Sequence, residues 1–215
     1  MNGLCNRRRV FLPVSLLALI VGLGCGNARY FAGMRLSGQP MGRFLMVPPV
    51  AQSDNLLCGP AATVSVLLYN NISLDSIRES LKTQPSTAKW RAADIVALAR
   101  SVGLEAYSYQ GSLDNAFVNV AKGRPVVILL RGPPRTGRYP SFSWFEETTH
   151  MITAKAHWVV LVGWTNDHDV VLLDPLQGYL VMQRKDIRKD WNYMDYVCVV
   201  MAPHSKEARK SKGSP

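Results

Sequence analysis

Four residues of this 215-residue chain have types and an order that suit thiol attack on a carbonyl group: Gln52, Cys58, His157 and Asp174. A cysteine attacks as its thiolate, which a helix N-terminus and a neighbouring imidazolium favour by lowering the thiol pKa. A glutamine amide can donate to the oxyanion that develops during attack, and the backbone N–H of the cysteine can be the second donor. An aspartate can orient the imidazole and stabilise its charged form.

Cys58 lies six residues after Gln52 and opens an apolar run that is typical of a buried helix. The following Gly59-Pro60 and the polar residues before it predict a turn into that helix, because proline is tolerated in a first turn. A residue at such a turn is partly exposed and can act as a nucleophile. The alternatives are a buried core cysteine for Cys58 and a plain surface residue for Gln52.

His157 heads an apolar strand, where a neutral imidazole needs a partner. We expect it to be the base, and the alternative is a core histidine bonded to the backbone. The other histidines fit less well, since His150 lies in a long loop, His168 in a turn with acids on both sides, and His204 near the C-terminus. Histidine changes its charge near neutral pH, which suits it to proton transfer.

Asp174 follows the apolar segment Val170–Leu173 and precedes Pro175. Seventeen residues separate it from His157, enough for one hairpin that would bring the carboxylate beside the base. The alternative is turn chemistry, because Asp-Pro often starts a turn. Asp167 and Asp169 are predicted to lie at the hairpin tip and are weaker candidates.

The segments Gln52–Ala62, His157–Gly163 and Asp174–Pro175 resemble the bacteriocin-processing cysteine peptidases, the double-glycine leader peptidases of the papain-like superfamily. The resemblance covers residues 45–202. It implies an α+β papain-like fold, with an N-terminal helical half packed on a C-terminal antiparallel sheet and the active-site cleft between them. It also implies a peptide or protein substrate, with Cys58 as nucleophile, His157 as base and acid, Asp174 as orienter and Gln52 as oxyanion donor. A stand-alone exported branch, without an ABC transporter part, is the expected subgroup.

The first 24 residues are typical of a secretory signal, with three arginines at positions 7–9 followed by the apolar run Val10–Leu23. Gly24 before Cys25 predicts a lipoprotein signal, in which Cys25 becomes the lipidated first residue. Ordinary cleavage and an uncleaved anchor are the alternatives. Gly26 lacks the aspartate that often retains lipoproteins in the inner membrane, which favours an outer-membrane lipoprotein on the periplasmic side of a bacterial envelope.

We therefore divide the chain into a signal peptide (1–24), a tether (25–44), a peptidase domain (45–202) and a basic disordered tail (203–215). The net charge is +10, and part of it lies in the tail. That tail is either a solvated end or a segment attracted to anionic lipid. We expect no nucleic-acid partner, because no binding motif accompanies the charge. The sequence does not indicate an oligomeric state.

The predicted elements follow from apolar periodicity and turn residues. Helices are expected over Cys58–Tyr69, Leu74–Leu81, Ala92–Val102, Ser112–Lys122 and Lys185–Trp191. Strands are expected over Leu104–Tyr109, Pro125–Leu130, His157–Trp164, Asp169–Leu173, Tyr179–Met182 and Tyr196–Met201. Turns are expected at Asn166-Asp167 and Gln177-Gly178, and Trp158 and Trp164 are expected to pack on the sheet. The long stretch Arg131–Thr153 either lines the cleft or is a mobile surface loop.

Cys198 lies in a predicted buried strand, where cysteine acts as a small hydrophobe. A Cys58–Cys198 disulfide is the alternative, and it would block the thiol. No CxxC pair or Cys/His cluster indicates zinc, and no metal or organic cofactor is expected.

Three functions fit these observations. The first is an exported, membrane-tethered cysteine peptidase. The second is a papain-like acyl- or peptidyl-transferase, because the same site can pass the acyl group to an amine. The third is a catalytically silent envelope binding or assembly protein on the same scaffold.

Overall fold

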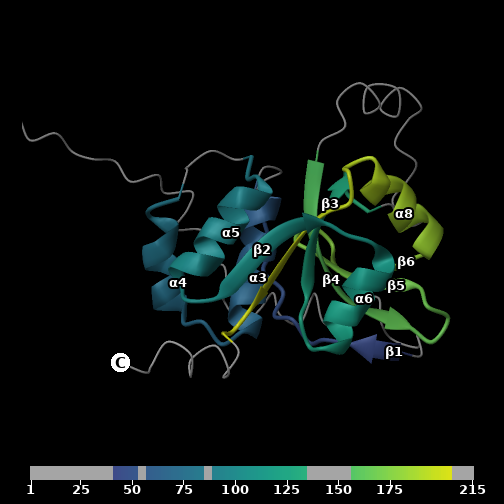
Figure 1. The fold of residues 1–215 in the computed structure, drawn as a ribbon, viewed down its shortest axis with the longest axis horizontal. Helices are drawn as coiled ribbons and strands as arrows, with labels where there is room; N and C mark the ends of the chain where they lie inside the picture. Colours follow the sequence, from purple (N-terminus) through teal and green to yellow (C-terminus); the bar gives the residue numbers. More distant parts are fainter. Residues whose placement is uncertain (1–40, 53–56, 85–88, 135–155, 205–215) are drawn as a thin grey trace, which may run out of the picture.

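The computed structural model describes residues 41–52, 57–84, 89–134 and 156–204. The predicted signal peptide, Cys25, most of the tether, most of the stretch Arg131–Thr153 and most of the tail lie outside the described residues. Figure 1 shows the arrangement of the elements. The helices are α3 (Cys58–Tyr69), α4 (Leu74–Leu81), α5 (Ala92–Ser101), α6 (Leu113–Ala121) and α8 (Arg184–Asn192). The strands are β1 (Met41–Phe44), β2 (Glu105–Gln110), β3 (Val126–Arg131), β4 (Ala156–Thr165), β5 (Val170–Asp174), β6 (Gly178–Met182) and β7 (Val197–Ala202).

The strands form one antiparallel sheet in the order β2-β7-β3-β4-β5-β6, and β1 pairs with β4. Consecutive strands β3 to β6 form a meander in which each strand pairs with the next. The last strand, β7, lies inside the sheet between β2 and β3. This order places β4 and β5, which carry His157 and Asp174, next to each other.

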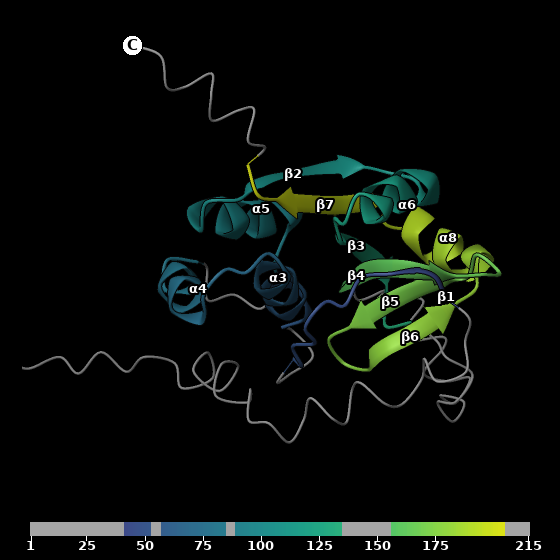
Figure 2. The same cartoon turned by 90° about the horizontal axis from the view of Figure 1, so that it is seen from below.

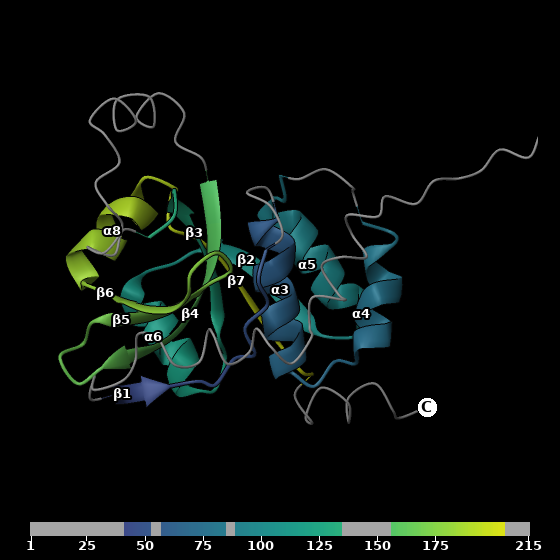
Figure 3. The same ribbon diagram turned by 180° about the vertical axis from the view of Figure 1, so that it is seen from behind.

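The helices lie in two groups on either side of the molecule (Figures 1 and 3). Helix α3 packs on β4, and α5 packs on β2 and β7. Helices α6 and α8 form the other group and pack on β4 and β3, respectively. Figure 2 shows α3, α4 and α5 together, away from α6 and α8. The predicted α+β class is confirmed.

Local sequence signals set the ends of these helices. The side chain of Ser112 accepts a hydrogen bond from Asn115 N at 3.1 Å, so it is the N-cap that the sequence predicted for α6. Ser73 caps α4 in the same way, through Ser76 N at 3.3 Å. Gly103 follows α5 with a φ of 86°, a conformation that ends a helix and suits glycine.

The predicted tether extends too far, because Met41–Phe44 forms strand β1. Arg43 pairs with Trp164 and Phe44 with Gly163, and the Phe44 ring packs edge-on against Tyr179 at 5.2 Å. The mixed polarity of the segment hid the strand, since a short strand with two exposed residues shows little apolar pattern. The ordered domain therefore begins before residue 45.

The core fills the space between the sheet and both helix groups. Strands β4 and β5 are almost entirely buried, and Trp191 of α8 is among the largest fully buried side chains. In the part of the chain that the structure describes, no helix is long and apolar enough to cross a membrane.

Candidate active site

Cys58 is the first residue of α3, where the helix dipole and the open backbone N–H groups favour a negative charge. The N-cap residue is Leu57, whose side chain cannot accept a hydrogen bond. Gly59 is needed next to the cysteine, because a Cβ there would lie 2.8 Å from Trp90 Cβ and 3.2 Å from Trp158 Cδ1. Two indoles therefore pack directly behind the start of the helix.

The register of β4 and β5 brings His157 and Asp174 together. Val160 lies opposite Leu173, so one further step places Asp174 beside Val159. His157 is two residues from Val159 and shares its face of the sheet, which makes His157 and Asp174 diagonal neighbours. Their side chains meet with His157 Nε2 at 2.9 Å from Asp174 Oδ1.

Strand β4 runs past the end of β5, and this overhang carries His157 and Trp158. Residues 156–161 pair with β3 on one side, whereas the β5 register starts only at Val160. On the side that β5 leaves open, Trp158 N lies 3.5 Å from Cys58 Sγ and donates to it. The Trp158 side chain is buried, in agreement with the predicted packing role, and its indole N–H donates to Trp90 O at 2.9 Å.

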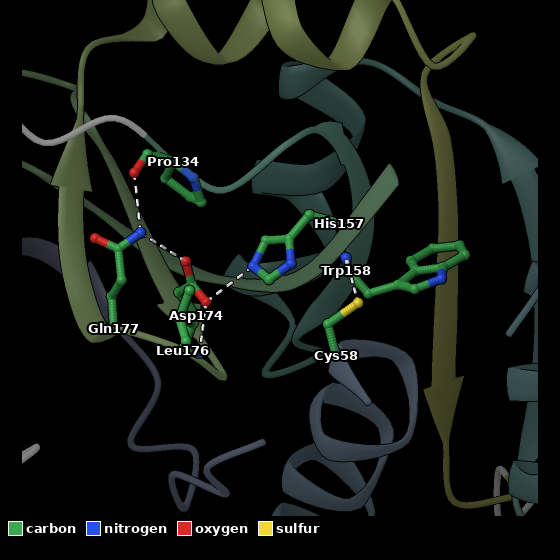
Figure 4. Close-up of polar contacts among 7 residues, drawn as sticks. All are labelled: Cys58, Pro134, His157, Trp158, Asp174, Leu176 and Gln177. Carbon is green, nitrogen blue, oxygen red and sulfur yellow. Dashed lines mark hydrogen bonds and ion pairs between the residues drawn. The ribbon is translucent and has the colours of Figure 1, made fainter. Parts of the chain in front are cut away.

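Figure 4 shows the His157 imidazole between the side chains of Asp174 and Cys58. One ring nitrogen faces Asp174, and the other lies on the Cys58 side. Cys58, His157 and Asp174 are all buried, with exposed fractions of 6%, 4% and 1%, respectively, so the expected partial exposure of Cys58 is wrong. Cys58 comes from the helical half and the other two from the sheet. The structure therefore brings together three of the four predicted residues at the contact between the two halves.

Electrostatics favour the charged form of both Cys58 and His157. Burial acts to raise the pKa of the Cys58 thiol, but the hydrogen bond and charge of His157 and the backbone N–H groups of Trp158 and Gly59 outweigh it, so this pKa is lowered. Burial acts to lower the pKa of His157, yet hydrogen bonds to Asp174 and Cys58 and their charges raise it to about 9. Both shifts favour the thiolate–imidazolium pair over the neutral thiol and imidazole.

Gln52 is held by its backbone at the turn that carries Asp174. It ends a segment, Leu45–Gln52, that we call the lead-in segment. Gln52 N donates to Pro175 O at 3.0 Å, and Val50 N donates to Ser65 Oγ of α3 at 3.1 Å. Earlier in the segment, Val47 O accepts a hydrogen bond from the Tyr179 hydroxyl. The lead-in segment therefore contacts both the sheet and α3, and it holds the backbone of Gln52 at the turn after β5.

The other candidates lie elsewhere. His168 occupies the β4–β5 turn with a φ of 63°, and His204 Nδ1 lies 2.9 Å from Glu105 Oε1 beyond β7. His150 and Cys25 lie outside the described residues. Cys58 and Cys198 are both free thiols, so the alternative disulfide between them is absent. Cys198 Sγ donates to Tyr109 O at 3.2 Å, and burial raises its pKa to about 11.

Among the hydrogen-bond donors at the site that the sequence did not single out, two are of different kinds. The first is Trp158 N–H, a backbone group whose direction depends on the strand register. The second is Gln177, interpreted as a turn residue, whose Nε2 donates to Asp174 Oδ2 at 3.0 Å. The spacing of three residues from Asp174 across a turn was the available signal. Within the described ranges, no group of three or more His, Cys, Asp or Glu residues could hold a metal ion.

Solved structures of low sequence identity share this fold. A C39-like peptidase from Bacillus anthracis has a TM-score of 0.55 at 17% identity, covering 76% of this chain and 99% of that chain. A double-glycine motif protease from an AMS/PCAT transporter, solved with a leader peptide, has a TM-score of 0.52 at 20% identity, covering 77% and 99%. The peptidase domain of Streptococcus ComA, a bifunctional ABC transporter, has a TM-score of 0.50 at 20% identity, covering 75% and 98%.

Comparison with curated protein sequences gives no match. The model of the Peptidase_C39 like family, in contrast, matches residues 44–199, which is most of the chain and contains all four predicted catalytic residues. The match confirms the predicted resemblance to the bacteriocin-processing cysteine peptidases, and the shared architecture confirms the papain-like fold. This chain belongs to the Peptidase_C39 like family of cysteine peptidases.

Proposed function

We propose that the protein is an exported, membrane-tethered cysteine endopeptidase that uses Cys58, His157, Asp174 and Gln52. The observation that carries the catalytic part of this proposal is the contact between Asp174 Oδ1 and His157 Nε2 at 2.9 Å. The same imidazole lowers the pKa of the Cys58 thiol. A cysteine in a merely structural role, such as Cys198, has a raised pKa instead.

The proposed reaction starts with the thiol proton on His157 and the thiolate on Cys58. The thiolate attacks the peptide carbonyl, and the oxyanion accepts hydrogen bonds from the Cys58 backbone N–H and the Gln52 amide. His157 then protonates the leaving amine, and a thioester remains on Cys58. Water, deprotonated by His157, hydrolyses the thioester and restores the pair. Throughout, Asp174 keeps the imidazole oriented and its positive charge stabilised.

The proposed substrate is a peptide or protein segment. A structural neighbour, the double-glycine motif protease, was solved with a leader peptide, which supports a peptide substrate for this chain. A leader peptide and a surface or secreted protein are the two substrate sources that fit an exported enzyme.

The proposed location is the periplasmic side of a bacterial envelope, with the protein attached as an outer-membrane lipoprotein through Cys25. The sequence supports it through the arginines at positions 7–9, the apolar run Val10–Leu23 and the Gly24-Cys25 pair. Labelling of cells with a radioactive fatty acid tests it. Lipid should enter the wild-type protein and be absent from Cys25→Ser, and an unlabelled wild-type protein would rule out the anchor.

Cleavage of a peptide library by the full chain, followed by mass spectrometry, tests the activity. Cys58→Ala should abolish cleavage, while Cys198→Ala should retain it. Asp174→Asn should lower kcat/KM roughly 10- to 100-fold, the effect of losing a charge-assisted hydrogen bond of about 1.5–3 kcal/mol. Cleavage that survives Cys58→Ala would refute the assignment.

A further inference from the structure

Three hydrogen-bond donors among the described residues hold the Asp174 carboxylate. His157 Nε2 and Leu176 N lie at 2.9 and 2.7 Å from Oδ1. Among the described residues, the donor that the structure records for Oδ2 is Gln177 Nε2, at 3.0 Å. The plane of the carboxylate, and with it the direction of Oδ1 toward the imidazole, therefore depends on what holds Oδ2.

Gln177 is built to hold that oxygen. Its Nε2 also donates to Pro134 O at 2.9 Å, so each of its two N–H bonds has its own acceptor and the amide cannot rotate freely (Figure 4). The turn directs the side chain back toward Asp174, because Gln177 N donates to Asp174 O at 3.2 Å and Gly178 follows with a φ of 77°. Pro134 lies just beyond β3, so Gln177 joins the end of β5 to the end of β3.

We propose that Gln177 is a positioning residue for the reaction, acting through Asp174 to keep His157 aligned with Cys58. The inference rests on the proposed function, because it assigns Gln177 to the same site. If residue 177 served only to form the hairpin, its backbone hydrogen bond and the following Gly178 would be enough. The Gln177 side chain instead donates to the Asp174 carboxylate, which binds the His157 imidazole. Within the described residues, the Gln177 amide contacts Asp174 and Pro134 and no hydrogen bond joins it to Cys58, so its effect on the thiol must pass through Asp174.

Two substitutions separate the donor from the space that it fills. Gln177→Met keeps the length of the side chain but removes both N–H groups. We expect kcat to fall roughly tenfold with KM unchanged, the effect of one hydrogen bond to a charged acceptor. The matched control is Gln183→Met, at an exposed position whose side chain makes no capping bond, and it should leave kcat unchanged.

Gln177→Glu preserves the shape but places a second carboxylate against Asp174 Oδ2. When both groups are ionised, they repel and the donor is lost. When a proton is shared between them, the donor returns. The loss of activity relative to wild type should therefore be greatest at high pH and should shrink as the pH falls. A merely structural role predicts a loss that does not depend on pH in this way.

The background Asp174→Ala gives the decisive comparison. If Gln177 acts through Asp174, Gln177→Met should cause no further loss of kcat in that background. Equal losses in both backgrounds would overturn the proposal, as would wild-type kinetics for Gln177→Met.

An NMR titration of His157 keeps this inference separate from the proposed function. Gln177→Met should lower the raised pKa of His157 toward its ordinary value, whether or not the protein cleaves a peptide. If wild type is inactive but the His157 pKa falls in this variant, the peptidase function fails and the positioning stands. If the wild type cleaves peptides but the His157 pKa is unchanged in Gln177→Met, the peptidase function stands and the positioning role of Gln177 fails.

Discussion

Trp158 N donates to Cys58 Sγ across 3.5 Å. Trp158 directly follows His157, whose imidazole lowers the pKa of the same thiol. One short stretch of β4 thus supplies both the base and a backbone donor to the thiolate. Because strand neighbours point in opposite directions, this stretch presents a side chain at His157 and a main-chain N–H at Trp158 to the same sulfur. Small shifts of β4 relative to α3 should therefore change both contacts together.

The reactivity of Cys58 toward iodoacetamide should rise at a lower pH than that of an ordinary thiol. Its pKa is lowered by His157 and backbone N–H groups, whereas that of Cys198 is raised to about 11. Peptide mass mapping should show alkylation of Cys58 near neutral pH. His157→Ala should move the profile to higher pH, because burial then raises the pKa with less opposition.

His204→Ala is the matched control for this experiment, because His204 contacts Glu105 at the surface and not the thiol. It should leave the profile unchanged. Peptidase activity should also fall above about pH 9, where His157 loses its proton and can no longer protonate the leaving amine. Equal alkylation of Cys58 and Cys198 at neutral pH would argue against an activated thiolate.

Stability should depend on the charge of His157. Its folded pKa of about 9 lies above the ordinary 6.5, so the folded state binds the proton more tightly than the unfolded chain. The stabilisation is complete below about pH 6.5 and is lost as the pH rises through about 9. Because the thiolate titrates too, the measurement belongs in Cys58→Ala, where Asp174 still raises the pKa of His157 but the contribution of Cys58 is gone, so the loss of stability begins at a lower pH than in wild type.

Urea unfolding of Cys58→Ala across this range should show an unfolding free energy that decreases with rising pH. The same protein with His157→Gln lacks the titrating group and should show a flatter curve. Parallel curves for the two proteins would contradict the assignment of the raised pKa to His157.

Gly59→Ala should destabilise the protein, although alanine usually favours a helix over glycine by about 1 kcal/mol. The added Cβ would meet Trp90 Cβ at 2.8 Å and Trp158 Cδ1 at 3.2 Å. Overpacking of this kind costs about 1–3 kcal/mol and would move the indoles that support Cys58. We expect a lower Tm and slower alkylation of Cys58. A wild-type Tm and rate would show that the two indoles can move aside freely.

Gly163→Ala should separate β1 from β4, because a Cβ at residue 163 would lie 2.2 Å from the backbone oxygen of Arg43. Since β1 leads into the segment that ends at Gln52, both stability and activity should fall. Hydrogen exchange of the Met41–Phe44 amides reports the loss of pairing directly. Ser108→Ala, at an exposed position of β2, is the control and should keep protection in β1. Retained protection in Gly163→Ala would mean that the strands adjust without parting.

The elements with strong apolar patterns could be predicted from the sequence, and so could the meeting of His157 and Asp174. Residue spacing carried that prediction, because one hairpin joins the two strands. Gln52 was predicted from its distance to Cys58, and the structure holds its backbone at Pro175. The site also depends on features that spacing does not encode. The direction of Trp158 N–H follows from where β5 stops along β4, and the donor role of Gln177 follows from the turn that folds its side chain back.

Strand β1 marks a different limit. Its residues carry little apolar pattern, and it is stable because Gly163 of β4 lets its backbone come close. That relation joins two segments more than a hundred residues apart, which no local window can reveal. The exposed face of the strand explains why its sequence resembled that of a tether.

The position of β7 within the sheet makes the alignment of the site depend on a distant part of the chain. The final strand inserts between β2 and β3, and β3 holds the edge of β4 that carries His157. Cys58 lies early in the described domain and β7 at its end. The alignment of His157 beside the nucleophile therefore depends on a strand that lies more than a hundred residues further along the chain, so local folding of α3 alone cannot assemble the site.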